Sequence, residues 1–188
     1  MRSAPGTLES PEQLGVEWYA AYVKHQHEAK AEEQLKRKGV EVFLPRQKVV
    51  RRWADRNKTL LTPLFPGYLF VRSDLSNKLQ ILSTPGIFFI VENAGHACVI
   101  PKSEIDSIRK VIESGVQARV HPFVSSGDKV RILYGPLSDI TGILTRFKNQ
   151  CRVVLAVEAL QKAVSVEVDL DNVERVTEGN VARAASRN

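Results

Sequence analysis

The stretch LFPGYLFVR, from Leu64 to Arg72, is the densest apolar and aromatic run in the chain, and polar stretches flank it on both sides. In an extended conformation, successive side chains point to opposite sides of the backbone. One side carries Leu64, Pro66, Tyr68 and Phe70. The other side carries Phe65, Gly67, Leu69 and Val71. Because both sets are apolar, the pattern predicts a strand inside a sheet that is covered on both faces. Pro66 lacks an N–H for the ladder, so we expect a bulge or the strand's entry at Pro66-Gly67.

Length and composition narrow the class of protein. The 188 residues are enough for one domain or two small ones, and the shares of hydrophobic (43%) and charged (26%) residues are ordinary for a soluble globular protein. No apolar run reaches about 18 residues, so we expect no membrane span. The N-terminal stretch MRSAPGTLESPEQLG has no apolar core and is not a signal peptide.

The positive charge is concentrated in the N-terminal part of the chain. Residues 1–124 contain 18 Lys and Arg against 13 Asp and Glu, whereas residues 125–176 contain 7 of each. The segment 46–58, RQKVVRRWADRNK, reads as a long β-hairpin with its tip near Asp55-Arg56-Asn57. Its cations either protect exposed strand edges from pairing or contact phosphates. The candidate nucleic-acid-binding residues are Arg46, Lys48, Arg51, Arg52, Arg56 and Lys58.

The order of the expected elements divides the chain into two domains. Residues 1–15 are expected to form a disordered leader, and residues 16–115 alternate strands and helices in the manner of an α+β domain. Residues 116–124 are expected to be a linker. Residues 125–176 contain short strands separated by turns, which suggests a small barrel. Residues 177–188 are expected to be a flexible tail.

No catalytic or metal-binding pattern is found in the sequence. It contains no G-x-S-x-G motif and no phosphate-binding P-loop. The four histidines show no ligand spacing with cysteines or carboxylates. The sequence therefore predicts a binding protein rather than an enzyme, with no cofactor and no metal.

Three motifs, in order and at matching spacing, resemble the NusG family of transcription factors. Leu64 to Arg72 resembles the family's signature strand, and Pro63-Leu64-Phe65-Pro66 is similar to that of specialised, RfaH-like paralogs. Trp18-Tyr19 begins the first strand, as in the family. The run Gly127 to Arg131, followed by Gly135-Pro136 and Gly142, resembles a KOW motif. The resemblance implies an α+β NGN-like domain, with an antiparallel sheet and flanking helices, followed by a small all-β SH3-like KOW barrel.

The resemblance also implies a transcription elongation and antitermination factor. In the family, the N-terminal domain docks on the clamp helices of RNA polymerase through an apolar groove. Carried over by motif, the groove residues are Tyr22, Phe65, Tyr68, Phe70, Ile105 and Ile108. Each of them would serve equally well as an ordinary core residue. A second contact, to the polymerase gate loop, would involve Asn77 and Lys78, although Asn77-Lys78-Leu79 departs from the His-Thr-Thr pattern of RfaH-like members.

The KOW barrel of the family recruits either the termination factor Rho or a small-subunit ribosomal protein. Leu160 lies at the corresponding turn, but Leu160-Gln161 departs from the usual pattern and leaves the recruited partner open. In RfaH-like members, this domain can instead fold as a helical hairpin packed against the groove. The β-branched residues of Val153 to Val168 favour strands in this chain. We expect a cytoplasmic monomer that also meets DNA near the transcription bubble.

The alternative is a ribosome-associated or RNA-binding KOW protein. An RNA-binding domain usually carries a basic patch of its own. The zero net charge of residues 125–176 argues against this alternative.

Overall fold

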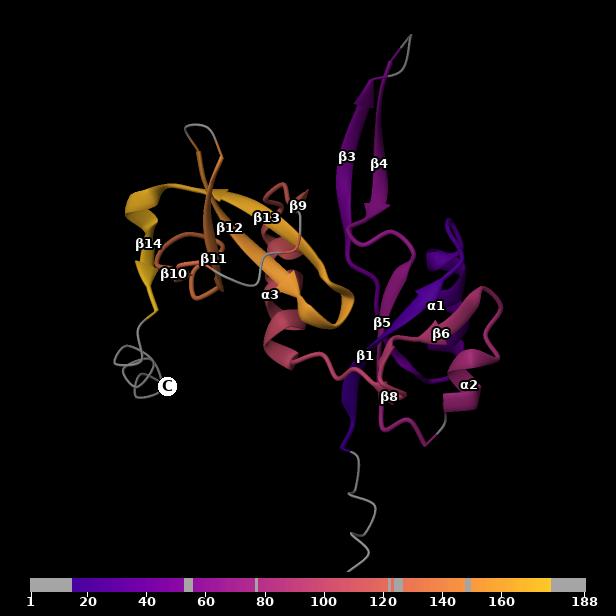
Figure 1. Ribbon diagram of the computed structural model, residues 1–188. Coiled ribbons are helices and arrows are strands. Elements are labelled where there is room, and N and C mark those ends of the chain that lie inside the picture. The colour runs from indigo at the N-terminus through magenta and orange to yellow at the C-terminus, as the bar shows by residue number, and fades with distance from the viewer. Residues whose placement is uncertain are drawn as a thin grey trace, which may run out of the picture.

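The computed structural model describes residues 15–176 apart from 53–55, 77, 122, 124–126 and 148–149. Figure 1 shows an N-terminal lobe built on one sheet and a strand-rich C-terminal lobe, which we call the barrel. The N-terminal sheet is antiparallel and has the strand order β2-β5-β1-β6. Its strands are β1 (Glu17–Val23), β2 (Glu41–Phe43), β5 (Tyr68–Ser73) and β6 (Ile87–Ile90). The predicted leader, except Gly15, and the predicted tail lie outside the described residues.

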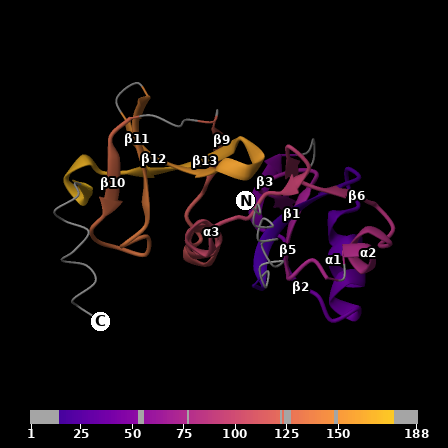
Figure 2. The same cartoon turned by 60° about the horizontal axis from the view of Figure 1, so that its bottom comes forward.

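Helices cover both faces of this sheet. Helices α1 (Glu28–Arg37) and α2 (Lys78–Leu82) lie over one face, and helix α3 (Lys102–Ser114) lies over the other (Figure 2). Along β1, Tyr19 and Ala21 belong to the apolar cluster on the α1 side, whereas Trp18 and Ala20 belong to the cluster on the α3 side. The expected α+β lobe, with an antiparallel sheet and flanking helices, is confirmed.

The strand predicted at Leu64 begins only at Tyr68, because the chain turns at Gly67. Gly67 has φ +81°, a left-handed conformation that glycine adopts without strain. A Cβ at this position would lie 3.3 Å from the Tyr22 ring. The buried Gly67 N–H donates to Glu28 Oε1 at 2.9 Å, and the Val23 N–H donates to the Gly67 carbonyl at 2.8 Å. Gly67 is thus the predicted entry of the signature strand.

A separate β-hairpin projects from the N-terminal lobe (Figure 1). It consists of β3 (Arg46–Arg52) and β4 (Asn57–Pro63), whose register runs from Arg46 opposite Pro63 to Arg52 opposite Asn57. Residues 53–55, which include Asp55 of the predicted tip, lie outside the described residues. A shorter hairpin, β7 (Glu92–Asn93) with β8 (His96–Ala97), follows β6.

The barrel is built on an antiparallel sheet of order β14-β10-β11-β12-β13-β9. Its close packing depends on Gly142, where a Cβ would lie 2.5 Å from the Val154 carbonyl oxygen. Two short 3-10 helices, η1 (Glu158–Leu160) and η2 (Leu170–Asn172), lie between its strands. The strands are β9 (Arg119–His121), β10 (Lys129–Ile132), β11 (Thr141–Phe147), β12 (Gln150–Val157), β13 (Lys162–Val168) and β14 (Val173–Arg175).

Strand β9 lies inside the segment 116–124, which the sequence analysis treats as a linker. It pairs with β13 through His121 opposite Ala163 and Arg119 opposite Ser165. The adjoining Ala118 is buried in the apolar cluster that contains the barrel core. The barrel sheet therefore extends N-terminal to residue 125.

Helix α3 lies between the N-terminal sheet and the barrel (Figure 2). One continuous apolar cluster includes Trp18 and Phe70 of the sheet, Ile105 and Ile108 of the helix, and Val153 of the barrel. On the sheet side, the Arg109 guanidinium lies 5.2 Å from the centroid of the Phe43 ring. On the barrel side, Lys110 Nζ donates to the carbonyl of Ser138. The two lobes thus share one helix.

Because β9 pairs with β13, a barrel fragment that includes β9 should be more stable to heat than one that lacks it. Fragments 117–176 and 125–176 should both give β-type circular dichroism. The longer one keeps the β9–β13 hydrogen bonds, which contribute about 1 kcal/mol or more. For a domain of this size, that corresponds to a melting temperature about 4–8 °C higher. Equal melting temperatures would show that β9 adds nothing, and a helical spectrum in either fragment would contradict the all-β assignment.

Candidate functional site: an aromatic face and a basic hairpin

Four aromatic side chains meet at the end of the α3-side sheet face. Tyr22 on β1 lies directly opposite Tyr68 on β5, with ring centroids 5.3 Å apart in an edge-on arrangement. Phe89 on β6 stacks on Tyr22 at 5.0 Å, and Phe88 lies 5.9 Å from the same ring. We call these four residues the aromatic patch. Phe88 and Phe89 are 59% and 50% exposed, so much of the patch is open to solvent.

An irregularity in the pairing of β6 with β1 exposes the two phenylalanines. The register shifts between Tyr22 and Val23, so that Ile87 and Ile90 are buried while Phe88 and Phe89 between them are exposed. Strand β6 is an edge strand of the sheet. Clustered exposed aromatics are unusual on a protein surface and typical of protein-binding hot spots. The patch is therefore a candidate docking face for another protein.

The structure separates the six predicted groove residues into two groups. Tyr22 and Tyr68 belong to the aromatic patch. The other four are buried in the cluster around α3: Phe65 (2% exposed), Phe70 (0%), Ile105 (0%) and Ile108 (1%). Phe70 packs against Phe43 and Phe65, with ring centroids 6.1 and 5.9 Å apart. In this structure, these four side chains are core residues, two of them from helix α3 itself and two packed in the same cluster.

Sequence reasoning missed Phe88 and Phe89. The available signal was the run IFFI at residues 87–90, which contains no polar residue. Such a run reads as a strand buried on both faces. Two adjacent aromatics can both lie on one face of a sheet only where the strand is irregular, and the sequence does not reveal that irregularity.

The barrel reaches the border of the aromatic patch. Lys162 Nζ, on β13, lies 5.4 Å from the centroid of the Tyr68 ring, a cation–π geometry. Partial burial raises the pKa of the Tyr68 hydroxyl, with a smaller contribution from Tyr22. Leu160, the predicted recruitment residue of the barrel, is only 8% exposed and belongs to the cluster shared by the two lobes.

The cations of the β3–β4 hairpin divide into anchored and exposed groups. Arg46 pairs with Glu32 of α1 at 2.5 Å, and the Glu32 side chain is only 9% exposed, so Arg46 fixes the base of the hairpin. Lys48 and Arg52 are exposed. Arg56 and Lys58 are also exposed, and both have interactions within the structure. The side chain of Arg51 lies outside the described part of the chain.

The two faces of the hairpin differ. Lys48, Val50 and Arg52 alternate along one face of β3, and Val50 is 65% exposed. Across the strand pair, Leu61 lies opposite Lys48 and is 63% exposed. On the other face, Gln47 Oε1 accepts a hydrogen bond from the Ala118 N–H at 3.3 Å, next to the start of the barrel. The hairpin thus presents a cationic, partly apolar face to solvent.

Lys78, one of the two predicted gate-loop residues, is the first residue of helix α2. Lys78 pairs with Glu92 of β7. Asn77 lies outside the described residues. Next to Lys78, Leu79 is 82% exposed. An exposed apolar side chain, Leu79, therefore lies next to Lys78 at the start of α2.

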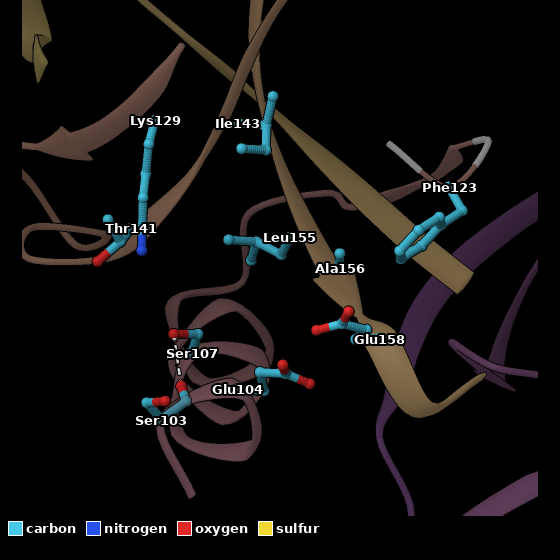
Figure 3. A pocket seen from close by; sticks show the side chains of 10 residues that line it. All are labelled: Ser103, Glu104, Ser107, Phe123, Lys129, Thr141, Ile143, Leu155, Ala156 and Glu158. Carbon is cyan, nitrogen blue, oxygen red and sulfur yellow. Dashed lines mark hydrogen bonds between the residues drawn. The ribbon is translucent and has the colours of Figure 1, made fainter. Parts of the chain in front are cut away.

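A cavity of about 450 Å³ lies between α3 and the barrel. Its walls come from α3, from the segment before β10, and from β10, β11, β12 and η1 (Figure 3). Within the described ranges, no group of three or more His, Cys, Asp and Glu side chains is arranged to hold a metal ion. Across the same residues, no helix is long and apolar enough to span a membrane.

Comparison with known proteins places this fold among transcription factors. A family model described as "Transcription termination factor nusG" matches residues 16–109. The "Transcription termination/antitermination protein NusG" of Thermus thermophilus is 30% identical over 184 residues, covering 85% of this chain and 98% of that protein. The protein of the same name from Pseudomonas aeruginosa is 27% identical over 168 residues, covering 84% of this chain and 94% of that protein.

A solved structure shows the same fold. It is described as "Domain interaction in Thermotoga maritima NusG" and has a TM-score of 0.51 at 20% identity. The match covers 86% of this chain and 97% of that chain.

The burial difference between Phe70 and Phe89 predicts opposite effects of truncation. Phe70→Ala should lower the free energy of unfolding by about 3–5 kcal/mol, because it leaves a cavity in the core. Phe89→Ala should cost only about 1 kcal/mol, the contribution of one aromatic pair. Urea denaturation of both variants measures the difference. A Phe89→Ala variant as unstable as Phe70→Ala would mean that Phe89 is a core residue rather than a surface residue.

Proposed function

Because the chain belongs to the NusG family of transcription termination and antitermination proteins, we propose that it binds RNA polymerase through its N-terminal lobe and recruits further factors through its barrel. It acts by binding, with no reaction of its own, and it works in the cytoplasm beside the transcription bubble. The polymerase contact is the clamp helices, as the resemblance of the signature strand implies.

The observation that carries the proposal is the aromatic patch. The exposed Phe88 and Phe89 and the partly buried Tyr22 and Tyr68 form one aromatic surface on the N-terminal sheet. Large aromatic side chains supply much of the binding energy at protein interfaces, and a tyrosine hydroxyl adds a polar contact. Two of the four were expected in the groove from the resemblance alone. The proposed contact is therefore centred on the patch, and the buried Phe65, Phe70, Ile105 and Ile108 support it from below.

The exposed cations of the hairpin support a second contact, to nucleic acid near the transcription bubble. Lys48 and Arg52 lie on one face of a ribbon that projects from the lobe (Figure 1). A projecting ribbon with a fixed base is suited to reach DNA beside a large enzyme. Arg46 contributes by holding that base through Glu32. The predicted gate-loop contact of Asn77 and Lys78 remains part of the proposal.

Recruitment by the barrel involves Leu160 in the turn between β12 and β13. In the arrangement described, Leu160 is buried, so recruitment requires that the barrel move away from α3. The recruited factor is either Rho or a small-subunit ribosomal protein. Neither the neutral barrel nor the Leu160-Gln161 turn distinguishes these two.

The patch predicts which variants lose polymerase affinity. Phe89→Ala and Tyr68→Ala should weaken binding to an elongation complex by about 2 kcal/mol or more each if they are hot spots. Affinity is measured by titration, after circular dichroism has shown that each variant is folded. The matched control is Leu170→Ala, because Leu170 is also about half-exposed (47%) but lies on the barrel, away from the patch.

Folded Phe89→Ala and Tyr68→Ala variants with wild-type affinity would overturn the assignment of the patch. Capture from a lysate tests the function itself. Recovery of polymerase subunits is expected, whereas recovery of ribosomal RNA alone would favour a ribosome-associated protein.

The hairpin predicts a change in salt dependence. Replacing Lys48 and Arg52 by Ser should leave folding intact, because exposed charges contribute little to stability. Each lost phosphate contact lowers the slope of log affinity against log salt by about 0.7–0.9. The control replaces the exposed Lys24 and Lys30 by Ser, which removes the same charge elsewhere in the lobe. If both double variants keep the wild-type slope on the elongation complex, the hairpin does not contact nucleic acid.

A further inference from the structure

Two carboxyl groups face each other where helix α3 meets the barrel. Glu104 extends from α3 and Glu158 from η1, and Figure 3 shows both directed into the space between the helix and the barrel. Oε2 of Glu104 is buried and has no hydrogen-bond partner among the described residues. The backbone and the carboxyl group of Glu158 are both close enough to influence the pKa of the Glu104 carboxyl group. The polar contact of Glu104 with the barrel therefore brings a second acidic group beside it.

The cations around this pair are engaged elsewhere or lie at a distance from it. Lys129, on β10, lies on the opposite wall of the cavity beside Thr141 (Figure 3). Lys162, on β13, lies over the Tyr68 ring. On α3, Lys102 pairs with Asp106 at 2.5 Å, and Arg109 lies over Phe43 and 3.9 Å from Asp106. The hydroxyl group of Ser107 donates a hydrogen bond to the backbone carbonyl of Ser103.

The environment of Glu104 favours its neutral form. Burial is the largest influence and raises the pKa of its carboxyl group, and the negative charge of Glu158 raises it further. The polar backbone of Glu158 acts in the opposite direction but does not reverse the upward shift of the Glu104 pKa. An ionised Glu104 is thus unfavourable in this position because it is partly desolvated and next to a like charge.

The contact between α3 and the barrel has the features of a separable interface. Beside the apolar cluster that α3 shares with the barrel, the contact contains an open cavity of about 450 Å³, to which the helix contributes Ser103, Glu104 and Ser107. The chain between the two lobes contains Gly115 and has no regular structure at residues 116–118. Interfaces between domains of one chain commonly allow relative motion unless they are large and apolar.

We propose that Glu104 and Glu158 form a charge-operated release point between helix α3 and the barrel. When both are ionised, their repulsion and the desolvation of Glu104 favour separation of the barrel from the helix. When Glu104 is neutral, the barrel stays docked. The device acts within the chain itself, so it is tested without polymerase or any other partner. Separation removes Lys162 from Tyr68 and uncovers the turn that carries Leu160.

The direction of the pH dependence follows from linkage. The docked form holds the Glu104 proton more tightly than the separated form, in which the carboxyl group has its ordinary pKa. Docking is therefore favoured at low pH, and this advantage is lost as the pH rises from the ordinary value, about 4.3, through the raised value. Each unit by which docking raises the pKa changes the docking equilibrium about tenfold.

The experiment follows docking in the full chain by ¹⁵N relaxation. Docked lobes tumble together and give the barrel amides a longer correlation time than separated lobes. For the wild type, the docked fraction should rise as the pH falls from about 8 to about 5, toward the ordinary glutamate pKa. Glu104→Gln, which imitates the neutral form, should dock more strongly than the wild type at neutral pH and lose most of the pH dependence. Glu158→Gln should shift the wild-type curve in the same direction by a smaller amount.

The matched control is Glu113→Gln, which removes the same charge from an exposed position on the same helix. It should behave as the wild type. Circular dichroism at each pH verifies that both lobes stay folded. The proposal is overturned if wild-type docking does not depend on pH, if docking weakens as the pH falls, or if Glu104→Gln releases the barrel. It is also overturned if Glu104→Gln and Glu113→Gln have the same effect.

Discussion

The buried edge of helix α1 positions both proposed binding surfaces. Glu28 and Glu32, four residues apart, are 4% and 7% exposed. Glu28 accepts the Gly67 N–H and so fixes the turn at which β5 starts, which places Tyr68 opposite Tyr22. One turn later, Glu32 holds Arg46 at the base of the hairpin. Burying a carboxylate without a partner lowers the stability of a protein. Substitutions that remove either of these two contacts should therefore be destabilising. The aromatic patch and the orientation of the hairpin both depend on them.

Local patterns in the sequence were sufficient for the fold class. The apolar alternation around Tyr68 predicted a strand covered on both faces, and the cationic run from Arg46 predicted a hairpin. Both depend only on residues close together in the chain. The mostly polar segment 25–38 is typical of a surface helix, although Glu28, Ala31, Glu32 and Leu35 share the buried side of α1. An acidic residue on a buried stripe reveals that it has a partner, but the partner, Gly67 or Arg46, is distant in sequence and was not predictable.

The candidate site was only partly predictable for the same reason. Tyr22 and Tyr68 came from the resemblance, and the structure brings them together. Whether Phe65 and Phe70 are surface or core depends on where α3 lies, which no local pattern specifies. Phe88 and Phe89 are exposed because β6 is an edge strand with an irregular register. Strand order and covering helices arise from long-range packing, so burial was the property that sequence reasoning predicted least well.

Helix α3 has an apolar side, which belongs to the cluster shared by both lobes, and a polar side, which lines the cavity against the barrel. Its apolar residues Ile105, Ile108 and Val111 are fully buried, and the loss of such area is costly in any arrangement of the lobes. The wall that it contributes to the cavity is instead polar, with Ser103, Glu104 and Ser107. Separation on that side exposes a carboxyl group that water solvates well, so part of the lost contact is compensated. The apolar side of the helix is shared by both lobes, and the polar cavity wall is the part of its contact with the barrel that charge can adjust.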